Sequence, residues 1–312
     1  MSESPNFEVQ RSTFDVQSSS LVSSEAPWPG LAPFTEDQAS FFYGRDEEIR
    51  ALARLMERKA LTVLFGQSGL GKSSLLQAGV FPRLRATSFC PVYIRLDHSE
   101  GAPSPTEQVK AMVAAEAARA GTWTKPGAAK PGETLWEFFH HRDDRLTDAS
   151  GRTIVPVLVF DQFEELFTLG AAARSTNSGS ETGAQRDRAV SFMSELAELV
   201  ENRPSEQLVE RLDTSSDEMD AFDFSRTDYR VCISLREDYL PHLEGLKTIM
   251  PALMENRMRL TQMTGTQALD AVIKPGGALV TPEVARAIVE FVSGARGGSV
   301  ERLAELQVEP PL

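Results

Sequence analysis

Four residues between positions 66 and 73 have the types and the spacing of a phosphate-binding loop. Gly66, Gly71, Lys72 and Ser73 match the Walker A pattern G-x-x-x-x-G-K-[ST]. In such a loop, inward-facing backbone N–H groups hold phosphate oxygens at a helix N-terminus, the lysine adds a positive charge, and the serine hydroxyl ligates Mg²⁺. The intervening residues, and the serine after the motif, belong to the same expected nucleotide site: Gln67, Ser68, Gly69, Leu70 and Ser74.

Two other interpretations of this glycine-rich segment are weaker. A dinucleotide-binding loop has the glycine order G-x-G-x-x-G, whereas this sequence has G-x-x-G-x-G. A simple surface turn does not explain why the apolar run 61–65 leads into the glycines and a helix-forming run follows over 73–78. The sequence therefore favours a strand, a phosphate-binding loop and a helix, in this order.

A second group of candidate site residues follows the apolar run 154–160. Asp161 stands where a buried strand would reach the carboxyl edge of a sheet, and we expect it to hold Mg²⁺ directly or through water. Glu164 and Glu165 come three and four residues later, and one of them is placed to polarise a water for attack on a γ-phosphate. Acidic residues are also common at helix N-termini because of the helix dipole, so it is the accompanying Walker A loop that favours the catalytic interpretation.

A third candidate is Arg236, which directly follows the strand-like run 231–235. An arginine at that edge of a sheet can sense or stabilise the charge of a γ-phosphate. The alternative is a salt bridge to the neighbouring Glu237 or Asp238, and the sequence leaves it open.

These residues need a sheet that brings several strand ends to one edge. Strand-like runs occur at residues 61–65, 91–97, 154–160 and 229–235, with a shorter fifth run at 257–263. Helical patterns or long connections separate them, which predicts an α/β fold with three layers and a mostly parallel five-stranded sheet. Helices are expected at 107–119, 133–141, 189–200, 266–273 (ended by Pro275) and after a Thr281 cap, with a loop over 170–186.

The expected domain boundaries follow from composition. Residues 1–26 are rich in serine and poor in apolar pattern, which predicts a disordered tail. Residues 27–264 would form the core, with insertions at about 100–150 and 170–228, and residues 265–312 would begin a helical lid subdomain. Within the second insertion, segment 205–228 has eight acidic residues against two arginines, which favours a solvated, partly disordered segment over an acidic contact surface.

Composition excludes several classes of function. The net charge of −13 over 312 residues argues against direct nucleic-acid binding and against a motor with a basic channel. The sequence contains no run of membrane-spanning length and no secretory signal pattern, so we expect no membrane association. Cys90 and Cys232 are far apart and lie in or beside apolar runs, as buried thiols of a reducing compartment do, which predicts a cytoplasmic protein.

One further cluster, His140 and His141 beside Arg142-Asp143-Asp144, has metal-binding residue types. Adjacent residues on a helix point about 100° apart and chelate a single ion poorly. A solvated helix end is therefore the favoured interpretation.

Taken together, these segments resemble the novel STAND NTPases, a bacterial group of signalling ATPases. The matching segments are PWPGLAPF (27–34), FFYGRDEEI (41–49), GQSGLGKSS (66–74), VLVFDQFEELF (157–167), ISLREDYL (233–240), IKPGGALV (273–280) and VEPPL (308–312). Walker motifs are common to all P-loop NTPases. The D-Q-F-E-E arrangement, with the G-R-D segment before it and S-L-R after it, is more specific to the novel STAND NTPases.

The resemblance implies particular roles for these residues. Gly44 and Arg45 would line the adenine end of the site, Asp161 would hold Mg²⁺, the Glu164–Glu165 pair would supply the catalytic carboxylate, and Arg236 would be a sensor. The nucleotide would be ATP, exchanged for ADP, although the residues alone leave the base open because they contain no guanine-reading N-K-x-D motif. Such proteins are switches in which ADP holds a resting form, ATP opens it, and slow hydrolysis resets it.

The resemblance also suggests that the chain is a core or a truncated product of a larger protein. Relatives continue past V-E-P-P-L into a helical bundle, a winged-helix-like element and a repeat or effector region, whereas this sequence stops at Leu312. Protein partners or self-assembly would act through those further regions. The leading hypothesis is ATP–Mg²⁺ binding with slow hydrolysis by a switch module, and the alternative is a non-hydrolysing nucleotide-binding interaction platform.

Overall fold

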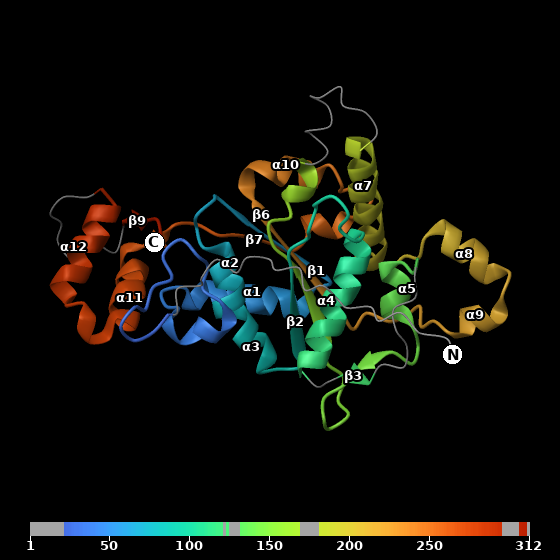
Figure 1. Cartoon of the computed structure of the whole chain (residues 1–312), viewed down its shortest axis with the longest axis horizontal. Helices are drawn as coiled ribbons and strands as arrows, with labels where there is room; N and C mark the ends of the chain where they lie inside the picture. Colours follow the sequence, from blue (N-terminus) through green and yellow to red (C-terminus); the bar gives the residue numbers. More distant parts are fainter. Residues whose placement is uncertain (1–21, 121–122, 125–131, 169–180, 295–305, 311–312) are drawn as a thin grey trace, which may run out of the picture.

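A parallel five-stranded sheet forms the centre of the molecule (Figure 1). The computed structural model describes residues 22–120, 123–124, 132–168, 181–294 and 306–310. The strand order is β2 (Phe89–Ile94), β5 (Val155–Phe160), β6 (Arg230–Arg236), β1 (Leu61–Gly66) and β7 (Arg257–Arg259). Each neighbouring pair runs parallel, so the α/β class and the parallel five-stranded sheet are confirmed.

Helices cover both faces of the sheet because strand side chains alternate between two cores. On one face, strand residues such as Val63, Leu158 and Ile233 are buried with the apolar sides of four helices. These helices are α4 (Pro105–Ala120), α5 (Leu135–His140), α7 (Glu181–Val200) and α10 (Leu240–Glu244). On the other face, Leu64 and Val159 pack against helices on either side of the Walker A loop. These are α1 (Asp46–Arg58) and the continuous helical segment of α2 (Lys72–Ser74), η2 (Leu75–Val80) and α3 (Phe81–Arg85).

Short elements connect this framework. They are η1 (Glu36–Phe41), β3 (Trp123–Thr124), β4 (Arg145–Leu146), η3 (Glu237–Tyr239), η4 (Pro251–Met254) and η5 (Gly277–Leu279). The strands β3 and β4 form an antiparallel pair apart from the main sheet. Most of the predicted tail, the Gly/Pro-rich stretch 125–131 and residues 170–180 of the predicted loop lie outside the described residues.

The two cysteines lie in β2 and β6, and both are buried, as the apolar runs around them predicted. Burial raises the pKa of both the Cys90 and the Cys232 thiols. Among the residues that the structure describes, no helix has the length and apolarity needed to cross a membrane.

The acidic segment 205–228 is folded, which corrects the expectation of partial disorder. It contains α8 (Glu206–Asp213) and α9 (Ser216–Asp220), which lie at one end of the molecule in Figure 1. Leu208 and Leu212 of α8 are buried in a small core with Trp136 and Phe222. Acidic residues dominate the composition of this segment, but the apolar residues four positions apart give α8 one face that can pack.

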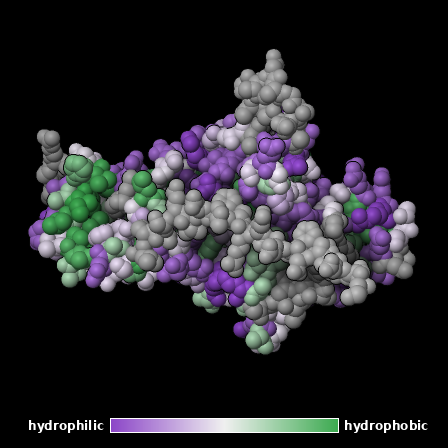
Figure 2. Space-filling view, viewed as in Figure 1, coloured by the Kyte–Doolittle hydropathy of each residue, from purple (hydrophilic) through white to green (hydrophobic). Residues whose placement is uncertain are grey.

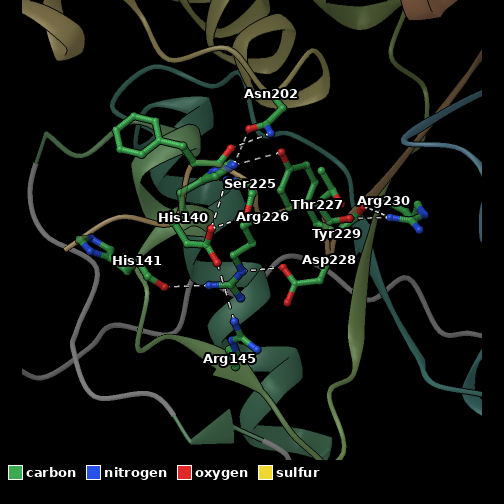
Figure 3. A network of polar contacts seen from close by, with 12 residues as sticks. His140, His141, Arg145, Asn202, Ser225, Arg226, Thr227, Asp228, Tyr229 and Arg230 are labelled. Atoms are coloured by element: carbon green, nitrogen blue, oxygen red, sulfur yellow. Dashed lines mark hydrogen bonds and ion pairs between the residues drawn. The ribbon is translucent and has the colours of Figure 1, made fainter. Parts of the chain in front are cut away.

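The prediction of a solvated helix end at His140 is also wrong. His140 is fully buried, and its ring stacks on Trp136 with centroids 3.9 Å apart. Its Nδ1 faces the Trp136 carbonyl at 2.7 Å. Its Nε2 faces Asn202 Oδ1 at 2.8 Å, as Figure 3 shows. Tyr229, directly before β6, packs against the same ring and donates to the Leu199 carbonyl of α7, so His140 joins α5 to the end of α7 and to the central sheet. Searched over the described residues, the chain shows no His, Cys, Asp and Glu group suited to a metal ion.

Two helix boundaries differ from the sequence prediction. The helix α7 begins at Glu181, eight residues before the predicted start, so part of the predicted 170–186 loop is helical. The helix α11 (Gly265–Gly276) continues through Pro275 and does not end before it. By contrast, α12 (Pro282–Val292) has the predicted cap, because the Thr281 side chain accepts a hydrogen bond from the Val284 N–H.

The two C-terminal helices form a small unit at the opposite end of the molecule from α8 and α9 (Figure 1). The strands β8 (Met263–Thr264) and β9 (Gln307–Val308) pair antiparallel beside them. A separate small core contains Met263, Ala268, Val289 and Val308. Apolar side chains gather on the outer surface of α12, as Figure 2 shows, and the exposed ones include Val284, Phe291 and Val292.

Candidate functional site

A cavity of about 340 Å³ lies at the carboxyl edge of the sheet. The Walker A loop forms its floor, and residues at or just after the carboxyl ends of β2, β5 and β6 form one side. The opposite side consists of the N-terminal segment 28–34, residues 41–43 and part of α11. In parallel sheets ligands bind at the carboxyl ends of the strands, so the cavity has the location of a ligand site.

The glycines of the Walker A loop serve two different structural needs. Gly69 and Gly71 have φ values of +81° and +80°, and a Cβ at either position would meet no atom within 4 Å. They are needed because the backbone adopts a left-handed conformation that turns it around the cavity. A Cβ on Gly66 would lie 2.5 Å from the Leu260 carbonyl oxygen, so this glycine allows the chain after β7 to pass close to the loop.

Lys72 extends along the Walker A loop. Its Nζ donates hydrogen bonds to the carbonyl oxygens of Gly66 and Gln67, both at 2.9 Å. Burial lowers the pKa of the Lys72 ammonium, while the carboxylates of Glu164 and Asp161 oppose this shift. The two acidic residues therefore help to keep the lysine positively charged beside the cavity.

The Walker A serine meets the predicted magnesium carboxylate. Ser73 Oγ donates to Asp161 Oδ2 at 2.5 Å, and the hydroxyl of Tyr93 donates to the same oxygen at 2.9 Å. Asp161 is only 5% exposed. A hydroxyl and a carboxylate oxygen are hard ligands of the kind that Mg²⁺ takes, so these two residues fit a magnesium site that keeps several waters.

Tyr93 is a site residue that the sequence analysis missed. It lies in β2, which β5 and β6 separate from the Walker A strand β1, and its hydroxyl reaches the Asp161 carboxylate across the sheet edge. Burial and the Asp161 charge raise the pKa of Tyr93, so it stays a neutral hydrogen-bond donor. The available signal was its place near the end of a predicted parallel strand, where side chains of neighbouring strands meet.

The structure separates the two candidate catalytic glutamates. Glu164 lines the cavity, and its Oε2 accepts a hydrogen bond from the backbone N–H of Arg236 at 3.3 Å. Burial raises the pKa of Glu164. Glu165 is not among the cavity-lining residues and forms an ion pair with Arg95 at 3.0 Å. The geometry therefore favours Glu164 as the residue that can face a reacting water.

The turn after Asp161 holds an unusual backbone conformation. Gln162 has a φ of 57°, which is uncommon for a residue with a side chain. Its neighbours are fixed by hydrogen bonds, from Asp161 N to the Ile94 carbonyl and from Phe163 N to the Ser234 carbonyl, at 2.9 and 3.0 Å. The turn brings both Asp161 and Glu164 to the cavity.

Arg236 lies at the cavity rim with a partner already present. Its guanidinium makes two hydrogen bonds to the Asp238 carboxylate, at 3.0 and 2.7 Å, and lies 5.7 Å from the ring centroid of Tyr239. The side chain is about half exposed, at 46%. The sequence left a sensor role and a salt bridge as alternatives for Arg236. The structure contains a salt bridge, to Asp238, and the Arg236 side chain also borders the cavity.

Gly44 and Arg45 connect the cavity to α11. Gly44 has a φ of +85°, and a Cβ there would lie 2.3 Å from the Gln267 carbonyl oxygen, so α11 packs directly on this backbone. Arg45 is buried; it donates to Glu48 at 2.7 Å and to the Thr261 carbonyl at 2.9 Å, and it lies 3.4 Å from the Leu70 carbonyl of the Walker A loop. Glu48 in turn accepts hydrogen bonds from Gln267 Nε2 at 3.0 and 3.1 Å.

Most of the predicted site residues meet at one cavity. Those that line it are Arg45, Ser68, Gly69, Leu70, Gly71, Lys72, Ser73, Ser74, Asp161, Glu164 and Arg236. Gly44, Gly66, Gln67 and Glu165 lie beside it without lining it. The Ser74 hydroxyl accepts a hydrogen bond from the backbone N–H of Phe34 at 3.1 Å, so it also has a structural partner.

Comparison with known proteins gives one family. The profile of the family described as novel STAND NTPase 1 matches residues 27–306, which confirms the resemblance found in the sequence. No curated protein matches the chain.

Among solved structures, the Orc1 protein of Aeropyrum pernix in complex with DNA is similar, with 15% identity and a TM-score of 0.46 over 86% of this chain and 59% of that one. Cdc6p of Pyrobaculum aerophilum has 14% identity and a TM-score of 0.44 over 80% of this chain and 54% of that one. The Walker-type ATPase paby2304 of Pyrococcus abyssi has 17% identity and a TM-score of 0.49 over 85% of this chain and 67% of that one. The chain thus spans little more than half of the first two proteins.

Proposed function

Because the chain belongs to the novel STAND NTPase 1 family and therefore contains an NTPase nucleotide-binding module, we propose that it binds ATP with Mg²⁺ and hydrolyses it slowly. The module would act as a nucleotide switch within a larger bacterial signalling or defence protein, in the cytoplasm and together with protein partners. The observation that carries this proposal is the pairing of Ser73 Oγ with Asp161 Oδ2 at 2.5 Å, beside Lys72 in the cavity of about 340 Å³.

Each residue has a distinct task in this proposal. The backbone N–H groups of the loop 68–73 hold the phosphate oxygens, and Lys72 exchanges the carbonyls of Gly66 and Gln67 for the outer phosphates. Ser73 and Asp161 would hold Mg²⁺, which when bound neutralises charge on the β- and γ-phosphates. Tyr93 keeps the Asp161 carboxylate in place through its hydroxyl.

Glu164 is the residue that would accept a proton from the attacking water. It lines the cavity, while its Oε2 is fixed by the Arg236 backbone N–H. A general base is most effective when its pKa approaches the working pH, and burial moves the pKa of Glu164 in that direction. The Arg236 guanidinium would release Asp238 and then stabilise the negative charge of the γ-phosphate.

A non-hydrolysing interaction platform is the second candidate. The bidentate contact between Arg236 and Asp238 favours it, because a guanidinium that stays on Asp238 is not available to a γ-phosphate. In that case the nucleotide would bind as a structural ligand.

Phosphate release and calorimetric binding of ATP and ADP, with and without Mg²⁺, test the proposal. Lys72→Ala should abolish binding and turnover, whereas Lys59→Ala, a matched control at an exposed lysine paired with Glu255, should change neither. Binding that depends on Lys72, without phosphate release above the Lys72→Ala background, would support the platform. Equal nucleotide binding by the wild-type and Lys72→Ala proteins would refute both functions.

A further inference from the structure

The helix α11 contains a backbone carbonyl that its own helix cannot satisfy in the usual way. Pro275 lies inside the helix, and it has no N–H to donate to the carbonyl of Ala271 four residues earlier. A proline in this position costs a helix the corresponding hydrogen bond unless another donor replaces it. The structure provides a donor from a distant part of the chain.

That donor is the indole N–H of Trp28. Its Nε1 lies 3.2 Å from the Ala271 carbonyl oxygen, across 243 positions of sequence. The indole ring also lies against the end of α11, because a Cβ on Gly276 would be 3.2 and 3.3 Å from the ring atoms Cη2 and Cζ2. Pro275 therefore leaves the Ala271 carbonyl available to the indole N–H, and Gly276 leaves space for the indole ring.

Trp28 begins the segment 28–34, here called the N-terminal strap, in which every residue lines the nucleotide cavity. The other end of the strap is tied to the Walker A helix, since Phe34 N donates to Ser74 Oγ at 3.1 Å. The Phe34 ring packs on Phe42 with centroids 5.5 Å apart. The strap thus runs from α11 to the phosphate-binding loop and forms the cavity wall between them.

A separate contact secures the start of α11, where Gln267 Nε2 binds Glu48. The Trp28 contact lies one turn further along the helix, at Ala271, and extends to its end at Gly276. Loss of Trp28 should therefore loosen the second half of α11 and the strap, while the first half stays docked.

We propose that Trp28 is a positioning residue that holds α11 and the N-terminal strap closed over the nucleotide by donating to the carbonyl that Pro275 leaves without a helix partner. The inference rests on the proposed nucleotide function of the cavity. Opening this wall gives a bound nucleotide a route out, so Trp28 controls the rate of nucleotide release.

A double-mutant cycle tests the pairing of Trp28 with Pro275. Trp28→Phe keeps an aromatic ring and removes the N–H, and a lost hydrogen bond of this kind should speed the dissociation of a fluorescent ADP analogue about fivefold. Pro275→Ala restores an N–H at position 275, which can bond to the Ala271 carbonyl within the helix and compete with the indole. In the Pro275→Ala protein, Trp28→Phe should then change the dissociation rate less than about twofold, because its partner is already satisfied.

Trp136→Phe is the matched control. Trp136 is fully buried in the small core beside α8, away from the cavity, so its substitution should lower stability and leave nucleotide dissociation unchanged. Independent effects of Trp28→Phe and Pro275→Ala would refute the pairing. A wild-type dissociation rate in Trp28→Phe would refute the positioning role, even if Lys72→Ala abolishes binding.

Amide hydrogen exchange of the full chain without added nucleotide separates this inference from the proposed function. Trp28→Phe should raise exchange about fivefold at the end of α11, near residues 271–276, and leave the start of the helix unchanged. This result is expected whether or not the wild-type protein binds nucleotide. Unchanged exchange at the end of α11 would refute the inference, whereas a lack of binding by the wild type would refute only the proposed function.

Discussion

Replacing Glu164 by glutamine should remove ATP hydrolysis and leave nucleotide binding nearly unchanged. The side chain keeps its shape and an oxygen that can accept from the Arg236 backbone N–H, now at 3.3 Å, while the negative charge is lost. Loss of a general base lowers turnover by roughly a hundredfold to ten-thousandfold. The fold should tolerate the change, because burial already disfavours the charged form of Glu164.

Glu165→Gln is the matched control on the neighbouring residue. Its ion pair with Arg95 is partly exposed, and such pairs contribute about 0–1 kcal/mol, so turnover should change by less than about fivefold. Single-turnover phosphate release and calorimetric ATP binding would be measured for both variants.

The pH dependence gives a second readout of the same residue. Burial raises the pKa of Glu164, so its carboxylate takes up a proton at a higher pH than an ordinary glutamate, whose pKa is about 4.3. Turnover should therefore fall as the pH drops through this raised pKa, and the acidic limb should be absent from the residual activity of Glu164→Gln. Wild-type turnover in Glu164→Gln, or an equal loss in Glu165→Gln, would show that the reasoning from cavity position is wrong.

Two further predictions concern the packing around the site and the inserted segment. Gly44→Ala should lower the free energy of unfolding by about 2–5 kcal/mol, because φ is +85° and the Cβ would lie 2.3 Å from the Gln267 carbonyl oxygen. Gly183→Ala is the control: its Cβ would meet no atom within 4 Å, so it should stabilise α7 by up to about 1 kcal/mol. Urea denaturation measures both, and a neutral Gly44→Ala would contradict the close packing of α11. Burial lowers the pKa of His140, so protonation below about pH 6.5 favours the unfolded chain. The difference in unfolding free energy between the wild type and His140→Gln should therefore shrink as the pH falls. A difference that grows as the pH falls would contradict the assigned burial effect.

The fold was predictable where a single pattern decided the outcome. Continuous apolar runs such as 154–160 predicted strands buried on both faces, and the Thr281-Pro282 pair predicted the start of α12. The predictions were wrong where tertiary contacts decide. The acidic segment 205–228 folds because Leu208 and Leu212 find Trp136, and His140 is buried because that same tryptophan stacks on it. Charge count and local sequence contain no information on such a partner.

The site shows the same division. The residues of the proposed phosphate site come from contiguous motifs. The Walker A spacing, together with a buried strand that ends before Asp161, predicted that Ser73, Lys72 and Asp161 would meet. Tyr93 was missed because its role depends on strand order: β5 lies between β2 and β6, so a β2 side chain reaches the carboxylate that follows β5. Pro275 predicted the end of a helix, as prolines do in isolation, but the indole of Trp28 provides the donor that lets α11 continue.

The cations around the cavity suggest how ATP and ADP could be told apart. Lys72 is bound to loop carbonyls, Arg95 to Glu165, and Arg236 to Asp238. Each cation must leave its present partner to bind a phosphate. It therefore contributes to the binding free energy only the difference between the new charge-assisted contact and the old contact. In the proposed function Lys72 would exchange neutral carbonyls for an anionic phosphate, which would favour the binding of both ATP and ADP. Arg236 would give up a carboxylate that holds it with two hydrogen bonds, so its exchange would be nearly balanced in free energy and would depend on a third phosphate close to the end of β6. Glu164 accepts a hydrogen bond from the backbone N–H of this same arginine, so a rearrangement of Arg236 that shifted its backbone would also move Glu164. The residue that would distinguish the two nucleotides and the residue that would activate the water therefore meet at one backbone position.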